Sequence, residues 1–185
     1  STVTGLVKWF VTNPLTGHTY GLDTNGVVYE IDFVTVSVLT GNTTSSSNGN
    51  GLGMFISPND PTKAFLFVAR NTAIDVYSFA STTWTTITPT LTSQNTHPIF
   101  TSSNNRIYFG NNSNVASLQE VTGSTFDPTN AATYIFNSAA LDLPAQYIVT
   151  NLTQLGENLV IGTCVGYSNF QALNYADIFL WDRES

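Results

Sequence analysis

Short apolar runs alternate with polar, turn-forming runs along the whole chain. The first segment has apolar strands predicted at residues 6–11, 18–22 and 27–32, with the pair Asn25-Gly26 before the third. Asn-Gly favours a tight hairpin because both residues adopt positive φ easily. The runs are rich in β-branched and aromatic residues, and few stretches have the Ala, Leu, Glu and Lys content of helices. The pattern predicts an all-β chain.

The same order recurs in three further segments. Their predicted strands are 53–56, 64–69 and 73–79; 98–101, 106–110 and 115–121; and 147–150, 159–163 and 176–181. A more polar fourth strand follows in three units, at 35–40, 84–88 and 134–136, whereas the fourth unit reaches Trp181–Ser185 where its outer strand should begin. A repeat of roughly 40 to 50 residues is the period of a propeller blade.

We therefore predict an all-β β-propeller of about four blades, or part of a larger propeller, as a single domain over residues 1–185. Its repeats lie at approximately 5–40, 52–92, 97–136 and 146–185. The alternative is a β-sandwich with evenly spaced strands, but a sandwich does not require strand order and length to repeat unit by unit. Two segments depart from the repeat: residues 41–53 form a polar interblade loop, and residues 122–141 have room for a short helix near 130–133.

Three segments resemble known propeller families. Val76–Ile87 is similar to part of a kelch-type blade, with an aromatic strand end and a Trp after a Ser/Thr turn, and Tyr20–Asp32 resembles the hairpin of WD-repeat-like propellers. The stretch from Leu141-Asp142-Leu143-Pro144 through 159–163 to Ala176–Asp182 is similar to propeller segments of tailed-phage virion proteins. This resemblance implies a virion protein, associated with the phage tail, whose partners are other virion proteins or copies of itself.

Charge excludes two classes of partner. The chain has 185 residues, a net charge of −7 and only 5 Lys and Arg residues. A surface that follows phosphates needs clustered basic side chains, so we expect no nucleic-acid partner and no binding to anionic membranes. No apolar run approaches the roughly 20 residues of a membrane helix, so we expect no membrane insertion. One cysteine, Cys164, excludes an internal disulfide.

The sequence offers few candidates for catalysis or metal binding. No nucleophile motif accompanies His18 or His97. Cys164 follows an apolar run, which indicates a small buried side chain and not an activated thiol. We predict no catalytic residues, no metal site and no cofactor. Glycoside hydrolysis needs two carboxylates about 5 to 9 Å apart. The aspartates considered for that role are Asp32, Asp60, Asp75, Asp142, Asp177 and Asp182.

The sequence thus favours a non-enzymatic structural or interaction module located in a virion. The alternative is a secreted or cell-surface carbohydrate-binding propeller that contacts a host-surface glycan, and a sialidase-like glycoside hydrolase is the third. For a ligand or partner contact, the candidate residues are Tyr167 and Phe170 in the insertion 166–174, because exposed aromatic rings on a projecting loop can stack on sugars.

Overall fold

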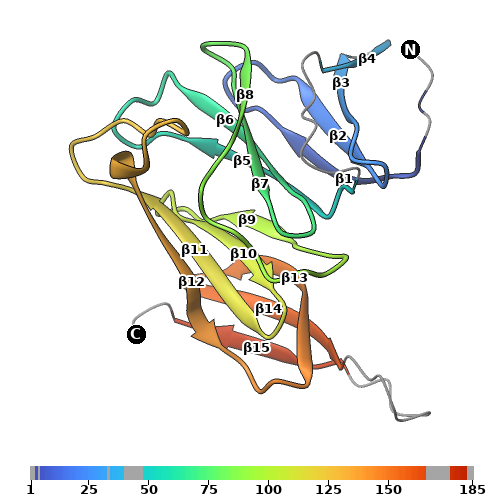
Figure 1. The fold of residues 1–185 in the computed structure, drawn as a ribbon, viewed down its shortest axis with the longest axis vertical. Helices are drawn as coiled ribbons and strands as arrows, with labels where there is room; N and C mark the ends of the chain where they lie inside the picture. Colours follow the sequence, from blue (N-terminus) through green and yellow to red (C-terminus); the bar gives the residue numbers. More distant parts are fainter. Residues whose placement is uncertain (1–2, 4, 33, 40–47, 166–175, 183–185) are drawn as a thin grey trace.

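The computed structural model describes residues 3, 5–32, 34–39, 48–165 and 176–182. Four antiparallel sheets follow one another along the chain as the four blades of a β-propeller (Figure 1). Blade 1 contains β1 (Val7–Thr12), β2 (Thr19–Asp23), β3 (Val28–Asp32) and β4 (Thr35–Val38). Blade 2 contains β5 (Gly51–Ile56), β6 (Ala64–Ala69), β7 (Ile74–Ser78) and β8 (Thr83–Thr86). Blade 3 contains β9 (Ile99–Thr101), β10 (Ile107–Asn111), β11 (Asn114–Glu120) and β12 (Tyr134–Asp142), and blade 4 contains β13 (Tyr147–Leu155), β14 (Asn158–Val165) and β15 (Ile178–Trp181).

Three apolar clusters join consecutive blades. The first packs Leu22 and Val28 of blade 1 against Leu66 of blade 2. The second contains aromatic rings from blades 2 and 3, including Phe67 and Phe109, whose centroids are 6.2 Å apart. The third joins blades 3 and 4, and its buried residues are Tyr108, Val115, Val149, Leu152, Leu159, Ile161 and Trp181. Each middle blade is therefore covered by a neighbour on both faces.

The second strand of blade 2 shows why this fold needs continuous apolar runs. Every residue of β6 is buried, because odd positions such as Phe65 and Phe67 face blade 3 while Leu66 and Val68 face blade 1. Side chains alternate between the two faces of a strand, so a strand buried on both faces must be apolar throughout.

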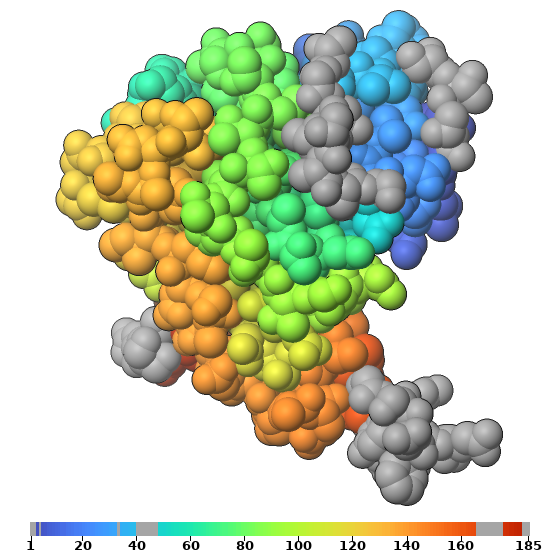
Figure 2. All heavy atoms as spheres, in the orientation of Figure 1, coloured from blue at the N-terminus to red at the C-terminus, as the bar shows by residue number. Residues whose placement is uncertain are grey.

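The two terminal blades do not cover each other. Among the described residues, no apolar cluster joins blade 4 to blade 1. The blue residues of blade 1 and the dark-orange to red residues of blade 4 lie toward opposite ends of the molecule (Figure 2). Within the described ranges, the first and fourth blades thus each have one sheet face without a neighbouring blade.

The open face of blade 4 is apolar. The register places Thr153, Val160 and Leu180 side by side on it, opposite the packed face that carries Ile161 and Trp181. Ile178 and Leu180 are 74% and 64% exposed. The open face of blade 1 is similar, because Phe10 and Val38 share a row across its sheet and are 60% and 40% exposed.

The predicted fold class and strand order are confirmed, with differences at some strand ends. The short helix expected near residues 130–133 is a 3-10 turn over Ala131–Thr133. The strands predicted at 134–136 and 147–150 are much longer, as β12 and β13. β5 begins at Gly51, so the predicted loop 41–53 ends earlier, and residues 40–47 lie outside the described residues. No helix in the described ranges is long and apolar enough to span a membrane.

Candidate functional site: a cleft between blades 3 and 4

A polar cleft lies between the outer part of blade 3 and the edge of blade 4. It combines a cavity of about 410 Å³ with an adjoining one of about 160 Å³, and the two share Arg106 and Gln119 in their walls. We call it the blade 3–4 cleft. Its walls include Arg106, Tyr108, Ser117, Gln119, Glu120, Ile135, Asn137, Glu157, Trp181 and Asp182.

Strand alternation explains why blade 3 presents polar groups here. Ser117 of β11 pairs with Tyr108 of β10 and with Asn137 of β12, so these three side chains share the face that looks toward blade 4. Leu118 and Phe136 form the next row and point to blade 2. One face of the outer strands is therefore apolar and packed, while the other carries hydrogen-bonding groups.

The strand number of blade 4 explains why these groups are not covered. Blades 1 to 3 each end in a fourth strand, whereas the described part of blade 4 ends at β15. The three described strands of blade 4 cover only the inner part of the blade 3 face. Ile135 on β12 is consequently 53% exposed, and the cleft opens over it.

Trp181 forms the boundary between the apolar interface and the cleft. Its ring packs edge-on against Tyr108, with centroids 5.7 Å apart and an interplanar angle of 78°. The side chain is 7% exposed, and its Nε1 has no hydrogen-bond partner among the described residues. A buried indole N–H normally has an acceptor.

The cleft is acidic. Glu120, Glu157 and Asp182 bring carboxylates to its walls, and Arg106 brings a guanidinium, which donates a hydrogen bond to Gln119 Oε1.

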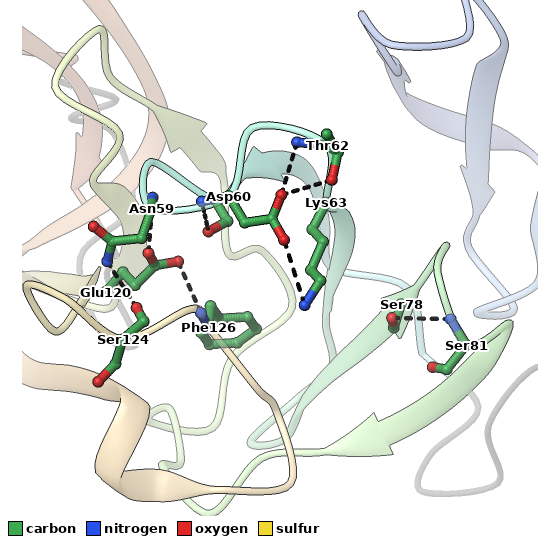
Figure 3. Close-up of polar contacts among 10 residues, drawn as sticks. Asn59, Asp60, Thr62, Lys63, Ser78, Ser81, Glu120, Ser124 and Phe126 are labelled. Atoms are coloured by element: carbon green, nitrogen blue, oxygen red, sulfur yellow. Dashed lines mark hydrogen bonds and ion pairs between the residues drawn. The ribbon is translucent and has the colours of Figure 1, made fainter.

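Glu120 has a structural role besides its place in the wall. Its Oε1 accepts from the backbone N–H of Asn59 at 3.0 Å, and its Oε2 accepts from that of Phe126 at 2.9 Å (Figure 3). Asn59 Nδ2 in turn donates to the backbone oxygens of Val121 and Ser124. These bonds attach the β5–β6 turn of blade 2 to the segment that follows β11.

The residues predicted as ligand contacts, Tyr167 and Phe170, lie outside the described residues, so their role stays a prediction. Sequence reasoning missed the cleft itself. The signal for it was the alternation of polar Ser117 and Gln119 with apolar residues in a strand whose other face is packed. That signal can be interpreted only once the described part of blade 4 is seen to end at its third strand.

Neither histidine lines the cleft, and both have structural partners. His18 Nδ1 is 2.7 Å from Glu30 Oε1, which also accepts from the Tyr20 hydroxyl at 3.0 Å, and the bond to Glu30 raises the pKa of His18. His97 is fully buried, with Nδ1 2.7 Å from Gly110 O and Nε2 3.0 Å from Asn71 O. Burial lowers its pKa, and this effect outweighs the two hydrogen bonds.

The aspartates considered for glycoside hydrolysis are dispersed. Asp75 is paired with buried Arg70, Asp60 accepts from Thr62, and Asp177 accepts from the Tyr147 hydroxyl at 2.6 Å. Asp32 and Asp142 are strand ends, and of the six only Asp182 lines the blade 3–4 cleft as described. Within the described ranges, no cluster of His, Cys, Asp and Glu could hold a metal ion.

Comparisons with known proteins concern the fold alone. The sequence matches no protein-family model and no curated protein. One similar solved structure is an α-L-arabinofuranosidase from Clostridium thermocellum, at 12% identity over 94% of this chain and 67% of that chain, with a TM-score of 0.49. Another is the extracellular domain of the hybrid two-component system BT4673 from B. thetaiotaomicron, at 12% identity over 86% of this chain and 25% of that chain, with a TM-score of 0.36. At these values, neither likeness carries an argument about a ligand or a reaction.

Proposed function

We propose that this chain is a non-enzymatic interaction module that assembles with copies of itself, the open face of blade 4 packing on the open face of blade 1 of the next copy. The observation that carries the proposal is the exposed apolar face of β13–β15. In each preceding blade, the corresponding face is covered by the next blade.

The internal interfaces supply the pattern for this contact. Blade 2 presents one face to blade 1, and blades 3 and 4 present the equivalent face to the blade before them. Blade 1 has no neighbouring blade on the equivalent face among the described residues, and Phe10 and Val38 are exposed at its two edges, although Tyr29 in the same row is 1% exposed. A second copy can therefore continue the succession of blades with the same kind of apolar sheet packing. Such a head-to-tail contact builds a ring or a filament, according to whether the rotation closes.

The expected strength follows from the side chains involved. Burying a Leu or Ile side chain contributes roughly 1.5–3 kcal/mol. Leu155, Ile178 and Leu180 are all more than half exposed, at 69%, 74% and 64%. Placing a carboxylate at Leu180 would bury an unpaired charge as well, so Leu180→Asp should weaken self-association at least about tenfold.

Sedimentation velocity over a wide range of protein concentration tests the proposal. We expect concentration-dependent assembly that persists in high salt, because screening reduces repulsion between copies of an acidic chain. Leu180→Asp and Phe10→Asp should each weaken it at least about tenfold. Val34→Asp is the matched control, since Val34 is 94% exposed in the β3–β4 turn, outside both faces. A chain that stays monomeric throughout, or assembly insensitive to both variants, overturns the proposal.

The location in a virion is part of this proposal and is supported by the sequence resemblance of residues 141–182 alone. Reconstitution with tail proteins from the same genome tests it: we expect co-sedimentation with tail assemblies that Leu180→Asp reduces. No co-sedimentation with any of them would overturn the virion location while leaving self-assembly standing.

A further inference from the structure

We propose that the cavity between the outer part of blade 2 and the β11–β12 connection of blade 3 binds a neutral saccharide unit. We call it the blade 2–3 cavity. Its volume is about 390 Å³, within the range of roughly 300–1,000 Å³ that is usual for small-ligand pockets. Its polar walls include Lys63, Ser78, Thr83, Thr85, Thr125 and Asp127. These walls belong to blades 2 and 3, so the site is independent of the proposed head-to-tail contact between blades 4 and 1.

The register of blade 2 explains why hydroxyl groups face this cavity. Phe65 of β6 pairs with Ser78 of β7, which pairs with Thr83 of β8, and this row lies on the face that packs against blade 3. In a neighbouring row, Thr85 of β8 pairs with buried Val76 of β7. Each row is apolar where it packs in the blade 2–3 interface and carries a hydroxyl at the outer strand.

Ser78 and Lys63 supply hydrogen-bond donors. Ser78 is 8% exposed, and its Oγ accepts a long bond of 3.4 Å from Ser81 N, so its hydroxyl proton has no acceptor among the described residues. Figure 3 shows the Lys63 side chain extending between Phe126 and Ser78, and all three residues line the cavity. An acceptor on a ligand would satisfy the buried Ser78 hydroxyl.

The carboxylate in the opposite wall is held by a loop motif that occurs twice in the chain. Asp60-Pro61-Thr62 lies in the β5–β6 turn, and Asp127-Pro128-Thr129 lies in the β11–β12 connection. In each motif, the threonine donates both its backbone N–H and its hydroxyl to Oδ1 of the aspartate, with hydroxyl bonds of 2.6 and 2.7 Å. Both aspartates are thereby oriented, and Oδ2 can accept from another donor.

The two motifs differ in what meets Oδ2. Lys63 Nζ is 3.5 Å from Asp60 Oδ2. At Asp127, no described residue donates to Oδ2, and this aspartate lines the cavity. A ligand hydroxyl can donate to it in a charge-assisted hydrogen bond.

Glu120 fixes the two motifs relative to each other. Its two oxygens accept from the backbone N–H groups of Asn59 and Phe126, the residues that directly precede the two aspartates (Figure 3). Glu120 is itself only 9% exposed. The walls of the cavity are therefore ordered in the protein alone, and a ligand that binds there loses little affinity to the ordering of side chains and loops.

These groups favour a neutral saccharide over an ion. One ammonium, from Lys63, and one carboxylate, from Asp127, occur in walls that otherwise carry hydroxyls of serine and threonine. Hydroxyls both donate and accept, as those of a saccharide do. A neutral ligand also places no like charge against either Lys63 or Asp127. Ala80 and Pro128 add apolar surface for the C–H groups of the sugar ring.

Amide chemical shifts of the unmodified chain, followed by NMR during a titration, test the proposal. The probes are the methyl glycosides of glucose, galactose, mannose and N-acetylglucosamine, with glucuronate as a charged comparison. We expect at least one neutral glycoside to bind with a millimolar Kd and to shift the amides of Ser78, Thr85 and Asp127. Glucuronate should bind at least about tenfold more weakly, because its carboxylate would face that of Asp127.

Substitutions in the walls separate this cavity from a general effect of charge. Asp127→Asn replaces Oδ2 with an amide donor and should weaken binding at least about tenfold. Ser78→Ala removes one neutral hydrogen bond and should weaken binding about 2–10-fold. The matched control is Asp60→Asn, which makes the same change in the equivalent motif, outside the cavity walls, and should change the Kd by less than about twofold.

The proposal is overturned if none of the four glycosides gives saturable shifts, or if the shifted amides lie outside the blade 2–3 cavity. Equal weakening by Asp127→Asn and Asp60→Asn would also overturn it, since net charge would then explain the effect. Tighter binding of glucuronate than of every neutral glycoside would contradict the neutral class of ligand. Leu180→Asp, which reports on self-association, should bind the glycoside as the unmodified chain does, so either proposal can fail alone.

Discussion

Arg70 and Asp75 form an ion pair across the β6–β7 turn, with Nε 2.9 Å from Oδ2 and both side chains fully buried. Arg70 Nη1 also donates to Gly26 O at 2.7 Å, and Thr86 Oγ1 donates to Asp75 Oδ1 at 2.6 Å. The guanidinium therefore connects the β2–β3 turn of blade 1 with blade 2. Buried charges of this kind are tolerated only with such complete pairing.

Asp75→Asn should lower the free energy of unfolding by about 3–5 kcal/mol, because it leaves the Arg70 charge buried without its counterion. Urea unfolding measures this. Asp60→Asn is the matched control: Asp60 pairs with Lys63 at 3.5 Å on the surface, and exposed pairs contribute at most about 1 kcal/mol. Equal losses in the two variants would show that the buried pair does not stabilise the blade 1–2 junction.

Gly53 allows the innermost strands of blades 2 and 3 to approach closely. A Cβ at this position would lie 2.3 Å from Ile99 Cγ2, well inside van der Waals contact. Gly53→Ala should therefore destabilise the chain by about 1–3 kcal/mol. Truncating the obstacle in Gly53→Ala/Ile99→Ala should recover part of the loss, so that the double variant is more stable than the sum of the two single changes. Strict additivity in urea unfolding would contradict the contact.

The sequence predicted strands best where burial is greatest. The bounds of β6 were predicted without error because six consecutive apolar residues between polar turns leave no other interpretation. β12 was predicted too short because Asn137-Ser138 looks like a turn, although Asn137 pairs with Ser117 beside a bulge in β12. β13 was cut at Thr150 for a similar reason, since the polar residues that follow face solvent on an exposed strand.

Predicting the cleft requires information that no local sequence pattern contains. The alternation of polar and apolar residues in β11 indicates the polar wall of the cleft. The opening of the cleft, however, results from the number of strands described in blade 4. The buried pair of Arg70 and Asp75 was likewise not predicted, because charged residues at a strand end ordinarily indicate a solvated turn. The repeats therefore allowed the fold to be predicted, whereas the long-range contacts that position the site could be recognised only in the structure.

Glu120 connects blades 2 and 3 through backbone N–H groups, so its replacement should act locally. In Glu120→Gln, one oxygen becomes an amide donor that faces the N–H of either Asn59 or Phe126. We expect amide exchange at the affected residue to accelerate and the free energy of unfolding to fall by about 1–3 kcal/mol. Glu157→Gln, which changes an exposed glutamate in the same cleft, serves as control and should change neither quantity. Unchanged protection of both amides in Glu120→Gln would contradict the role assigned to this carboxylate.

The two histidines should titrate on opposite sides of the ordinary value of 6.5. The hydrogen bond to Glu30 raises the pKa of exposed His18, and burial lowers that of His97. Between the lowered pKa of His97 and 6.5, the unfolded chain binds more protons at this residue than the folded chain does. The contribution of His97 to stability is therefore complete above pH 6.5 and falls as the pH drops below this value. The contribution of His18 has the opposite pH dependence. It is complete below pH 6.5 and is lost as the pH rises through the raised pKa of His18.

Since the chain contains just 2 histidines, their ring resonances can be followed by NMR and assigned with His18→Gln. We expect one resonance to titrate above 6.5 and to disappear in His18→Gln, while the second titrates below 6.5 and is unchanged. Removing the carboxylate charge in Glu30→Gln should return the His18 midpoint toward 6.5 without moving that of His97, because the two rings share no described hydrogen-bond partner. A His97 midpoint at or above 6.5 would mean that its two carbonyl partners outweigh the cost of burying the charged ring.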